Sequence, residues 1–105
     1  MAVIPNLILE SLNNYISLLE KNKLRIESAY LFGSYAKGLQ KEFSDIDIAL
    51  ISPDFCGKRF LDIDKIRKFK FMINDRISPL PYRPEDFNES DFFVKEILSS
   101  SIKLR

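Results

Sequence analysis

The sequence predicts a single α/β (α+β) domain in which helices pack on a small mixed sheet. Its 105 residues suit one small domain, and a composition that is 46% hydrophobic and 30% charged is ordinary for a soluble globular protein. Segments with helical periodicity alternate with short apolar runs, in the order helix, strand, strand, helix, strand, helix. We therefore expect residues 1–105 to form one domain around one core.

The first half of the chain contains one expected helix and two expected strands. Helical spacing of apolar residues predicts an amphipathic helix over about residues 5–21, carried by Ile8, Leu12, Tyr15, Ile16 and Leu19. Pro5 fits the first turn of such a helix, where a missing N–H is no loss. The run SAYLFGS, residues 28–34, is typical of a buried strand that stops at Gly33, and SDIDIALIS, residues 44–52, is typical of a second strand.

The second half predicts a helix, an edge strand and a last helix. The first of these spans about residues 60–71 and carries basic side chains on its outer side. Two prolines in residues 74–84, NDRISPLPYRP, remove backbone donors, so a strand here must lie at an edge of the sheet. Asn88 or Ser90 is expected to cap the last helix, and the tail from Ser99 is expected to fray. The apolar face of that helix is expected to consist of Phe92, Phe93, Val94, Ile97 and Leu98.

The charge balance and the small number of reactive side chains argue against several classes of function. Sixteen basic and fifteen acidic residues give a net charge of +1, which argues against nucleic-acid binding driven by overall charge. The single cysteine, Cys56, excludes an internal disulfide, and with no histidine in the chain it argues against a zinc site. Ser-His and Cys-His nucleophiles are also excluded, so acid–base chemistry would fall to carboxylates.

Two features of the sequence predict a cytoplasmic location. No apolar run approaches the length of a membrane span. The first stretch, MAVIPNLILESLNN, lacks the basic start of a signal peptide and contains a proline and a glutamate.

Two carboxylates open the second expected strand. Because side chains alternate along a strand, Asp45 and Asp47 should point to one face while their apolar neighbours face the core. Two like charges at this spacing repel each other, and a cation between them would stabilise the pair. Oxygen ligands without histidine or cysteine suit Mg²⁺. The other Asp-x-Asp, residues 62–64, falls at a helix start where residues two apart diverge, so we expect these acids only to interact favourably with the helix dipole.

A glycine–serine pair ends the first expected strand. Gly33 permits backbone dihedrals and a close approach to a ligand that other residues resist. If a helical turn begins at Ser34, its free N–H groups and the serine hydroxyl form an anion site. Lys37 and Lys41 follow on the connecting segment and can meet phosphate charge. Either motif alone is common in ordinary turns and solvated strand faces, whereas the two motifs at this spacing are far more specific.

The combined motif resembles a known signature. Gly33-Ser34, ten intervening residues and then Asp45-Ile46-Asp47 are similar to the signature of the nucleotidyltransferases of the DNA polymerase β superfamily, and Gly38 and Ser44 match its fuller form. With one expected domain, the chain most resembles the minimal nucleotidyltransferases (MNT), specifically over residues 30–52. The resemblance implies the nucleotidyltransferase fold and transfer of a nucleoside monophosphate from a triphosphate to a hydroxyl, with release of pyrophosphate.

The resemblance also implies roles for individual residues and a partner. Asp45 and Asp47 would be the catalytic acids that bind Mg²⁺, and Gly33 and Ser34 would hold the triphosphate of ATP. Minimal nucleotidyltransferases are often paired with a small helical HEPN protein, a toxin that the nucleotidyltransferase neutralises as antitoxin and can adenylylate on a tyrosine. The implied function is therefore AMP transfer from ATP to a protein hydroxyl, with a HEPN-type toxin as partner in a hetero-oligomer.

One position departs from the family pattern. The third strand of the family normally carries a third carboxylate, but the corresponding segment here is Ile77-Ser78-Pro79, with serine in the place of the acid. Asp75 is the nearest acid, and only a bulge would turn it to the face of Ser78. Two alternatives therefore stay open: a catalytically impaired antitoxin that acts by binding its toxin, and a nucleotidyltransferase that acts on a small molecule or RNA.

Overall fold

Residues 4–105 are described by the computed structural model, and the predicted order of helices and strands is confirmed, with three short elements added. Along the chain the elements are α1 (Asn6–Lys21), β1 (Ser28–Phe32), α2 (Ser34–Lys37), β2 (Ile46–Ile51), α3 (Arg59–Lys70), β3 (Ile77–Tyr82), η1 (Pro84–Asp86), α4 (Phe92–Ser100) and β4 (Ile102–Lys103). Within the described residues, no helix combines the length and the apolar content that a membrane span requires.

The four strands form one mixed sheet in the order β3-β2-β1-β4. Strand β2 pairs antiparallel with β1 and parallel with β3, which gives the mixed sheet that the sequence predicts. Strand β3 lies at an edge, as expected for a strand that contains Pro79 and Pro81.

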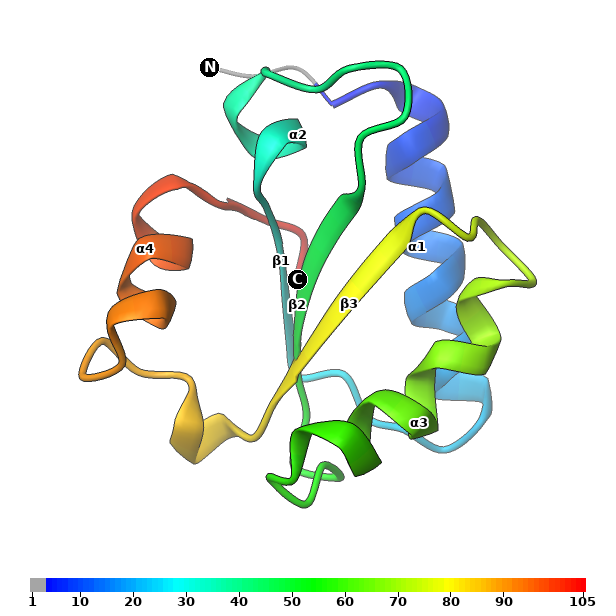
Figure 1. The fold of residues 1–105 in the computed structure, drawn as a ribbon. Helices are drawn as coiled ribbons and strands as arrows, with labels where there is room; N and C mark the ends of the chain where they lie inside the picture. The colour runs from blue at the N-terminus through cyan, green and yellow to red at the C-terminus, as the bar shows by residue number, and fades with distance from the viewer. Residues whose placement is uncertain (1–3) are drawn as a thin grey trace.

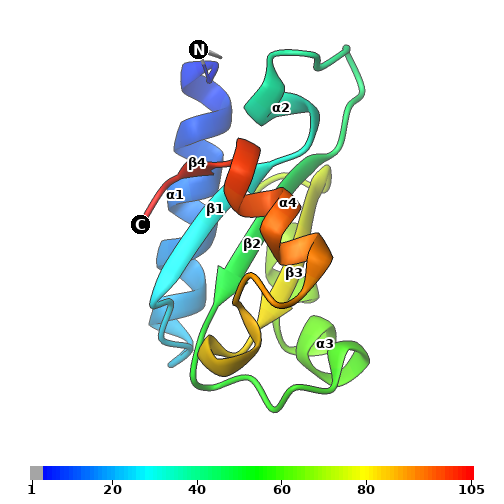
Figure 2. The same ribbon diagram turned by 90° about the vertical axis from the view of Figure 1, so that its left-hand side faces the viewer.

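Helices cover both faces of this sheet (Figure 1). Helices α1 and α3 lie on one side, where they pack on Ile46, Ile48 and Leu50 of β2. Helix α4 lies on the other side, seen in front of the strands in Figure 2, and packs Val94 and Ile97 against the alternate β2 residues. This alternation of β2 side chains between two cores fixes the face on which Asp47 lies.

The tail of the chain corrects one expectation. The tail does not fray: α4 continues to Ser100, and Ile102–Lys103 form β4, which pairs antiparallel with β1. The backbone N–H of Leu104 donates to the carbonyl of Ala29 at 2.8 Å. The edge of β1 left open by β2 offers these hydrogen bonds, and apolar Ile102 and Leu104 pack against the core beside it.

The start of α4 corrects two more expectations. Asp91, rather than Asn88 or Ser90, caps this helix, because its carboxylate accepts hydrogen bonds from the N–H groups of Phe93 and Val94. Phe92 and Phe93 are also not part of the buried face, since they are 76% and 49% exposed.

Asp62 has a more specific role than an interaction with the helix dipole. The residue is 2% exposed, and its two carboxylate oxygens accept the backbone N–H groups of Cys56 and Gly57 at 2.9 Å each. Burial alone would raise the pKa of Asp62, but these hydrogen bonds and the nearby Lys65 lower it below its ordinary value. Asp62 therefore holds the loop before α3, while Asp64 is exposed.

Candidate active site

Gly33 forms a sharp turn between β1 and α2. Its φ of 72° and ψ of −151° lie in a region that only glycine adopts readily. The turn places the Gly33 Cα directly against the side chain of Asp47, so that a Cβ at this position would overlap the Asp47 carboxylate. Helix α2 begins at Ser34, as the anion-site interpretation of the sequence requires.

The two acids of the Asp-Ile-Asp triplet lie at the start of β2. Asp47 is half-buried on the α4 side of the sheet, and in register it sits between Phe32 of β1 and Ser78 of β3. Asp45 precedes the strand and is exposed. Burial of Asp47 raises the pKa of its carboxyl above the ordinary value, and the negative charge of Asp45 raises it further.

This arrangement is compatible with a magnesium ion held in part by its substrate. Among residues 4–105, no three or more histidine, cysteine, aspartate or glutamate side chains gather closely enough to hold an ion alone. Mg²⁺ commonly takes one or two carboxylates and completes its shell with phosphate oxygens and water. Burial, and to a smaller extent the charge of Asp45, raises the pKa of Asp47, and a cation bound between the two carboxylates would favour their charged forms.

A third carboxylate does not join this pair in the described part of the chain. Ser78 lies beside Asp47 in the parallel pairing of β2 and β3. Asp75 lies instead in the turn before β3, where it is exposed. The side chain of Asn74 accepts the N–H of Arg76 and stabilises this turn, and β3 begins only at Ile77, after Asp75.

Lys37 and Lys41 on the connecting segment line two different pockets. Lys37 lines a pocket together with Gly33, so its charge lies near the turn. Lys41 lines a separate groove of about 700 Å³ with Tyr35 and Arg76. Ser44 has a local task, because its hydroxyl accepts the backbone N–H of Lys41 at 2.7 Å and holds the segment that leads into Asp45.

The pocket beside Gly33 brings in residues that the sequence reasoning missed. It has a volume of about 220 Å³ and lies between the end of β1, helix α2 and helix α4. Helix α4 contributes Phe93 and Glu96. No local sequence signal marks these two residues, because they lie far along the chain from Gly33 and reach it only through the packing of α4 on β1.

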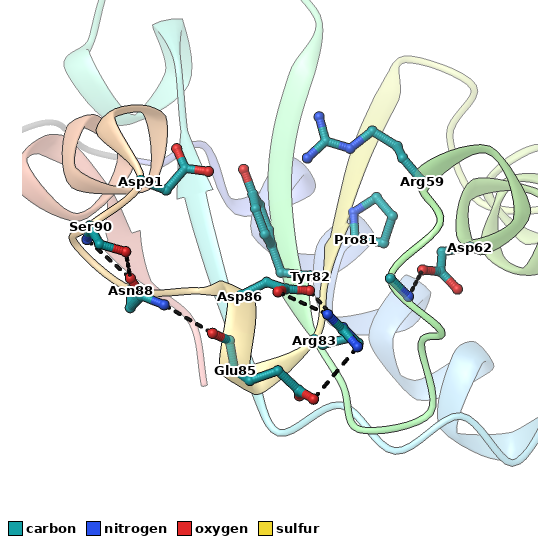
Figure 3. Close-up of a pocket in the computed structure, with 11 residues that line it drawn as sticks. Arg59, Asp62, Pro81, Tyr82, Arg83, Glu85, Asp86, Asn88, Ser90 and Asp91 are labelled. Atoms are coloured by element: carbon teal, nitrogen blue, oxygen red, sulfur yellow. Dashed lines mark hydrogen bonds and ion pairs between the residues drawn. The ribbon is translucent and has the colours of Figure 1, made fainter.

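A larger cavity lies at the opposite end of β3 (Figure 3). It measures about 410 Å³ and is lined by polar side chains that largely bind one another, such as Arg83 and Asp86, whose Nε and Oδ2 are 2.6 Å apart. Its Tyr82 follows Ser78 by four strand residues, a distance of about 13 Å. This cavity is therefore separate from the site around Asp47.

Sequence comparisons point to the same chemistry as the motif. The family model described as "Polymerase beta, Nucleotidyltransferase" matches residues 13–104. The protein adenylyltransferase MntA of Shewanella oneidensis is 48% identical over 42 residues, which are 40% of this chain and 30% of that protein. The match thus spans less than a third of the length of this curated relative.

Solved structures share the fold at low sequence identity. A protein from Sulfolobus solfataricus described as a nucleotidyltransferase superimposes with a TM-score of 0.66 at 17% identity, covering 91% of this chain and 78% of that one. A chain of a toxin–antitoxin structure determined with AMP-PNP superimposes with a TM-score of 0.61 at 21% identity, covering 88% of this chain and 71% of that one. Both similarities confirm the nucleotidyltransferase-like fold.

Proposed function

Because the chain belongs to the Polymerase beta nucleotidyltransferase family, we propose that it transfers AMP from ATP to a hydroxyl of a protein, with Mg²⁺ as cofactor. The observation that carries this proposal is the contact between Gly33 and Asp47, which joins the turn expected to hold phosphates to the acids expected to hold the metal. The similarity to a protein adenylyltransferase supports a protein as acceptor.

Each residue of the site has a proposed task. Gly33 lets the triphosphate approach the backbone closely, and the N–H groups and hydroxyl at Ser34 donate hydrogen bonds to its oxygens. Asp45 and Asp47 would hold Mg²⁺, which supplies positive charge against the phosphate oxygens. Helix α4 packs on the face of the sheet on which Asp47 lies.

The reaction is an in-line displacement at the α-phosphorus of ATP. The acceptor hydroxyl oxygen forms a bond to that phosphorus, and the bond to the bridging oxygen of pyrophosphate breaks with its electron pair. The hydroxyl proton must also leave. Since Ser78 occupies the position where a carboxylate would receive it, we propose that water or a group of the bound partner accepts this proton.

The proposed acceptor is a HEPN-type toxin, and the chain is its antitoxin in the cytoplasm. Similarity to MntA and to a chain of a toxin–antitoxin structure supports this partner class. Exposed aromatic side chains at the start of α4, Phe92 and Phe93, offer apolar surface near the site.

Intact-mass spectrometry of the candidate toxin, encoded by the neighbouring gene, tests the proposal. After incubation with this protein, ATP and Mg²⁺, the toxin should gain the mass of one or more AMP units. The Asp45→Asn/Asp47→Asn double variant should transfer none. It should stay folded because it removes a half-buried carboxylate whose pKa is raised by burial and, to a smaller extent, by the charge of Asp45. The Asp64→Asn variant, which changes an exposed acid of the other Asp-x-Asp, should transfer AMP as the unaltered protein does.

A second candidate function follows from Ser78. A site without a third carboxylate favours an antitoxin that binds its toxin without modifying it. This reading expects no gain in toxin mass, a stable complex of the two proteins, and full protection from the toxin by the Asp45→Asn/Asp47→Asn double variant. An unmodified toxin together with the absence of a complex would contradict both candidates.

A further inference from the structure

We propose that the 220 Å³ pocket beside Gly33 receives the base of the nucleotide, and that the base stacks on Phe93. This inference rests on the proposed function and assigns a place to the part of ATP that the Gly33, Ser34, Asp45 and Asp47 assignments leave without one. The pocket is lined by Phe32, Gly33, Lys37, Phe93, Glu96 and Ile97, together with Ser100.

The position of the pocket connects it to the triphosphate. Gly33 is both a wall of the pocket and the residue that contacts the Asp47 side chain. A triphosphate held at the Gly33 turn therefore has its attached nucleoside within reach of the same pocket. The other neighbour of Asp47, Ser78, lies on β3 at the opposite side of β2. We assign that side to the acceptor hydroxyl.

The walls of the pocket suit a flat ring. The rings of Phe32 and Phe93 meet edge to face, with centroids 6.1 Å apart and planes at 89°. Phe93 remains 49% exposed although Ile97, one turn later in α4, is 2% exposed. The aromatic surface of Phe93 is thus available to a second ring, and stacking of bases on aromatic side chains is a general source of nucleotide affinity.

The size and charges of the pocket also fit a base. Pockets for whole drug-sized ligands measure roughly 300–1,000 Å³. A volume of about 220 Å³ is too small for a complete nucleotide and suits one ring system. Lys37 and Glu96 supply one donor and one acceptor to the polar edges of a base.

Adjacent phenylalanines in α4 provide a matched test. Phe92 and Phe93 are both exposed, but only Phe93 lines the pocket. Isothermal titration calorimetry with Mg²⁺ present should show ATP binding about tenfold weaker in the Phe93→Ala variant. Binding of inorganic tripolyphosphate, which has no base, should be unchanged in that variant. The Phe92→Ala variant should bind both ligands as the unaltered protein does.

A fluorescence measurement covers the case in which Phe93→Ala disturbs the helix. The chain contains no tryptophan, so a Phe93→Trp variant carries a single indole. ATP should alter the emission of that indole and tripolyphosphate should not, whereas the emission of a Phe92→Trp variant should respond to neither.

The outcomes separate this inference from the proposed function. If the unaltered protein binds neither ATP nor tripolyphosphate, the proposed function fails and the base site fails with it. If it binds ATP, but the Phe93 variants bind it equally well and their emission is unchanged, only the base site is overturned. Equal weakening of ATP and tripolyphosphate by Phe93→Ala would also overturn it, because the effect would then not involve the base.

Discussion

At the scale of single residues, Gly33 carries two constraints at once. Its φ of 72° and ψ of −151° strain any other residue, and a side chain at this position would collide with Asp47. Gly38, at the other end of α2, has a φ of 71° and a ψ of 22°, a left-handed conformation that a non-glycine residue adopts at a cost of about 1–2 kcal/mol. An alanine at Gly38 would therefore cause backbone strain alone, whereas an alanine at Gly33 would cause strain and also displace the Asp47 side chain.

We expect the Gly33→Ala variant to lose ATP binding and to be destabilised by more than about 2 kcal/mol, because strain and the overlap with Asp47 add together. Urea unfolding and calorimetric titration with ATP would measure the two effects. The Gly38→Ala variant should lose only about 1 kcal/mol and keep its ATP affinity. A Gly33→Ala variant that bound ATP like the unaltered protein would show that the close contact with Asp47 is not needed.

The two Asp-x-Asp motifs, residues 45–47 and 62–64, have the same local pattern but different structural roles, which limits what the sequence can predict. Both Asp-x-Asp motifs have identical spacing, and their different settings, strand and helix, follow from the neighbouring apolar residues. The sequence does not reveal that Asp62 accepts two backbone N–H groups of the preceding loop. That role depends on how residues 56 and 57 turn back over α3. Gly57, with a φ of 91°, permits this turn, but a glycine alone does not indicate which side chain will accept the loop N–H groups.

At the scale of elements, strand β3 determines which side chain lies beside Asp47. Its prolines predict an edge position correctly, because an edge strand needs hydrogen-bond donors on one side only. The parallel pairing with β2 then places Ser78, and no carboxylate, beside Asp47. In the folded chain, the β3 residue in register with Asp47 is therefore a serine.

We expect the Ser78→Asp variant to transfer AMP at least about tenfold faster than the unaltered protein, because a positioned general base contributes roughly 10²–10⁴-fold in rate. Single-turnover measurement of toxin modification at saturating ATP and Mg²⁺ would test this. The Ser78→Ala variant is the matched control, and its rate should be unchanged if the hydroxyl takes no part. Slower transfer by both variants would mean that Ser78 itself assists the reaction.

Helix α4 shows where prediction from periodicity stops. Its existence and its buried residues Val94 and Ile97 follow from apolar spacing. The exposure of Phe93 and its place beside Gly33 depend on the crossing of α4 over β1, a long-range contact that local spacing does not encode. The proximity of Gly33 and Asp47, which lie on paired strands, was therefore predictable, whereas the position of Phe93 beside Gly33 was not.

At the scale of the whole molecule, the order of the long helices and strands was predictable, but the addition of β4 to the edge of the sheet was not. Each of the long elements has its own apolar pattern, while β4 is only two residues long and follows a serine-rich stretch. Such a segment becomes a strand only because the free edge of β1 accepts it. The pairing of β4 with β1 also brings Arg105 to Glu20 of α1, with Nη1 and Oε2 2.6 Å apart.

Deletion of residues 102–105 tests how much the pairing of β4 with β1 contributes to the stability of the fold. The shortened chain would lose the hydrogen bonds between Ala29 and the tail and would expose apolar surface under Ile102 and Leu104. We expect a loss of about 2–4 kcal/mol in the free energy of unfolding and a fall of roughly 10 °C or more in Tm. The Arg105→Ala variant removes the exposed ion pair with Glu20 and the hydrogen bond from Nη1 to the carbonyl of Ile26, and it should lose only about 1 kcal/mol. If deletion and Arg105→Ala destabilise the protein equally, the pairing of β4 with β1 contributes little and the fold is held by the other three strands alone.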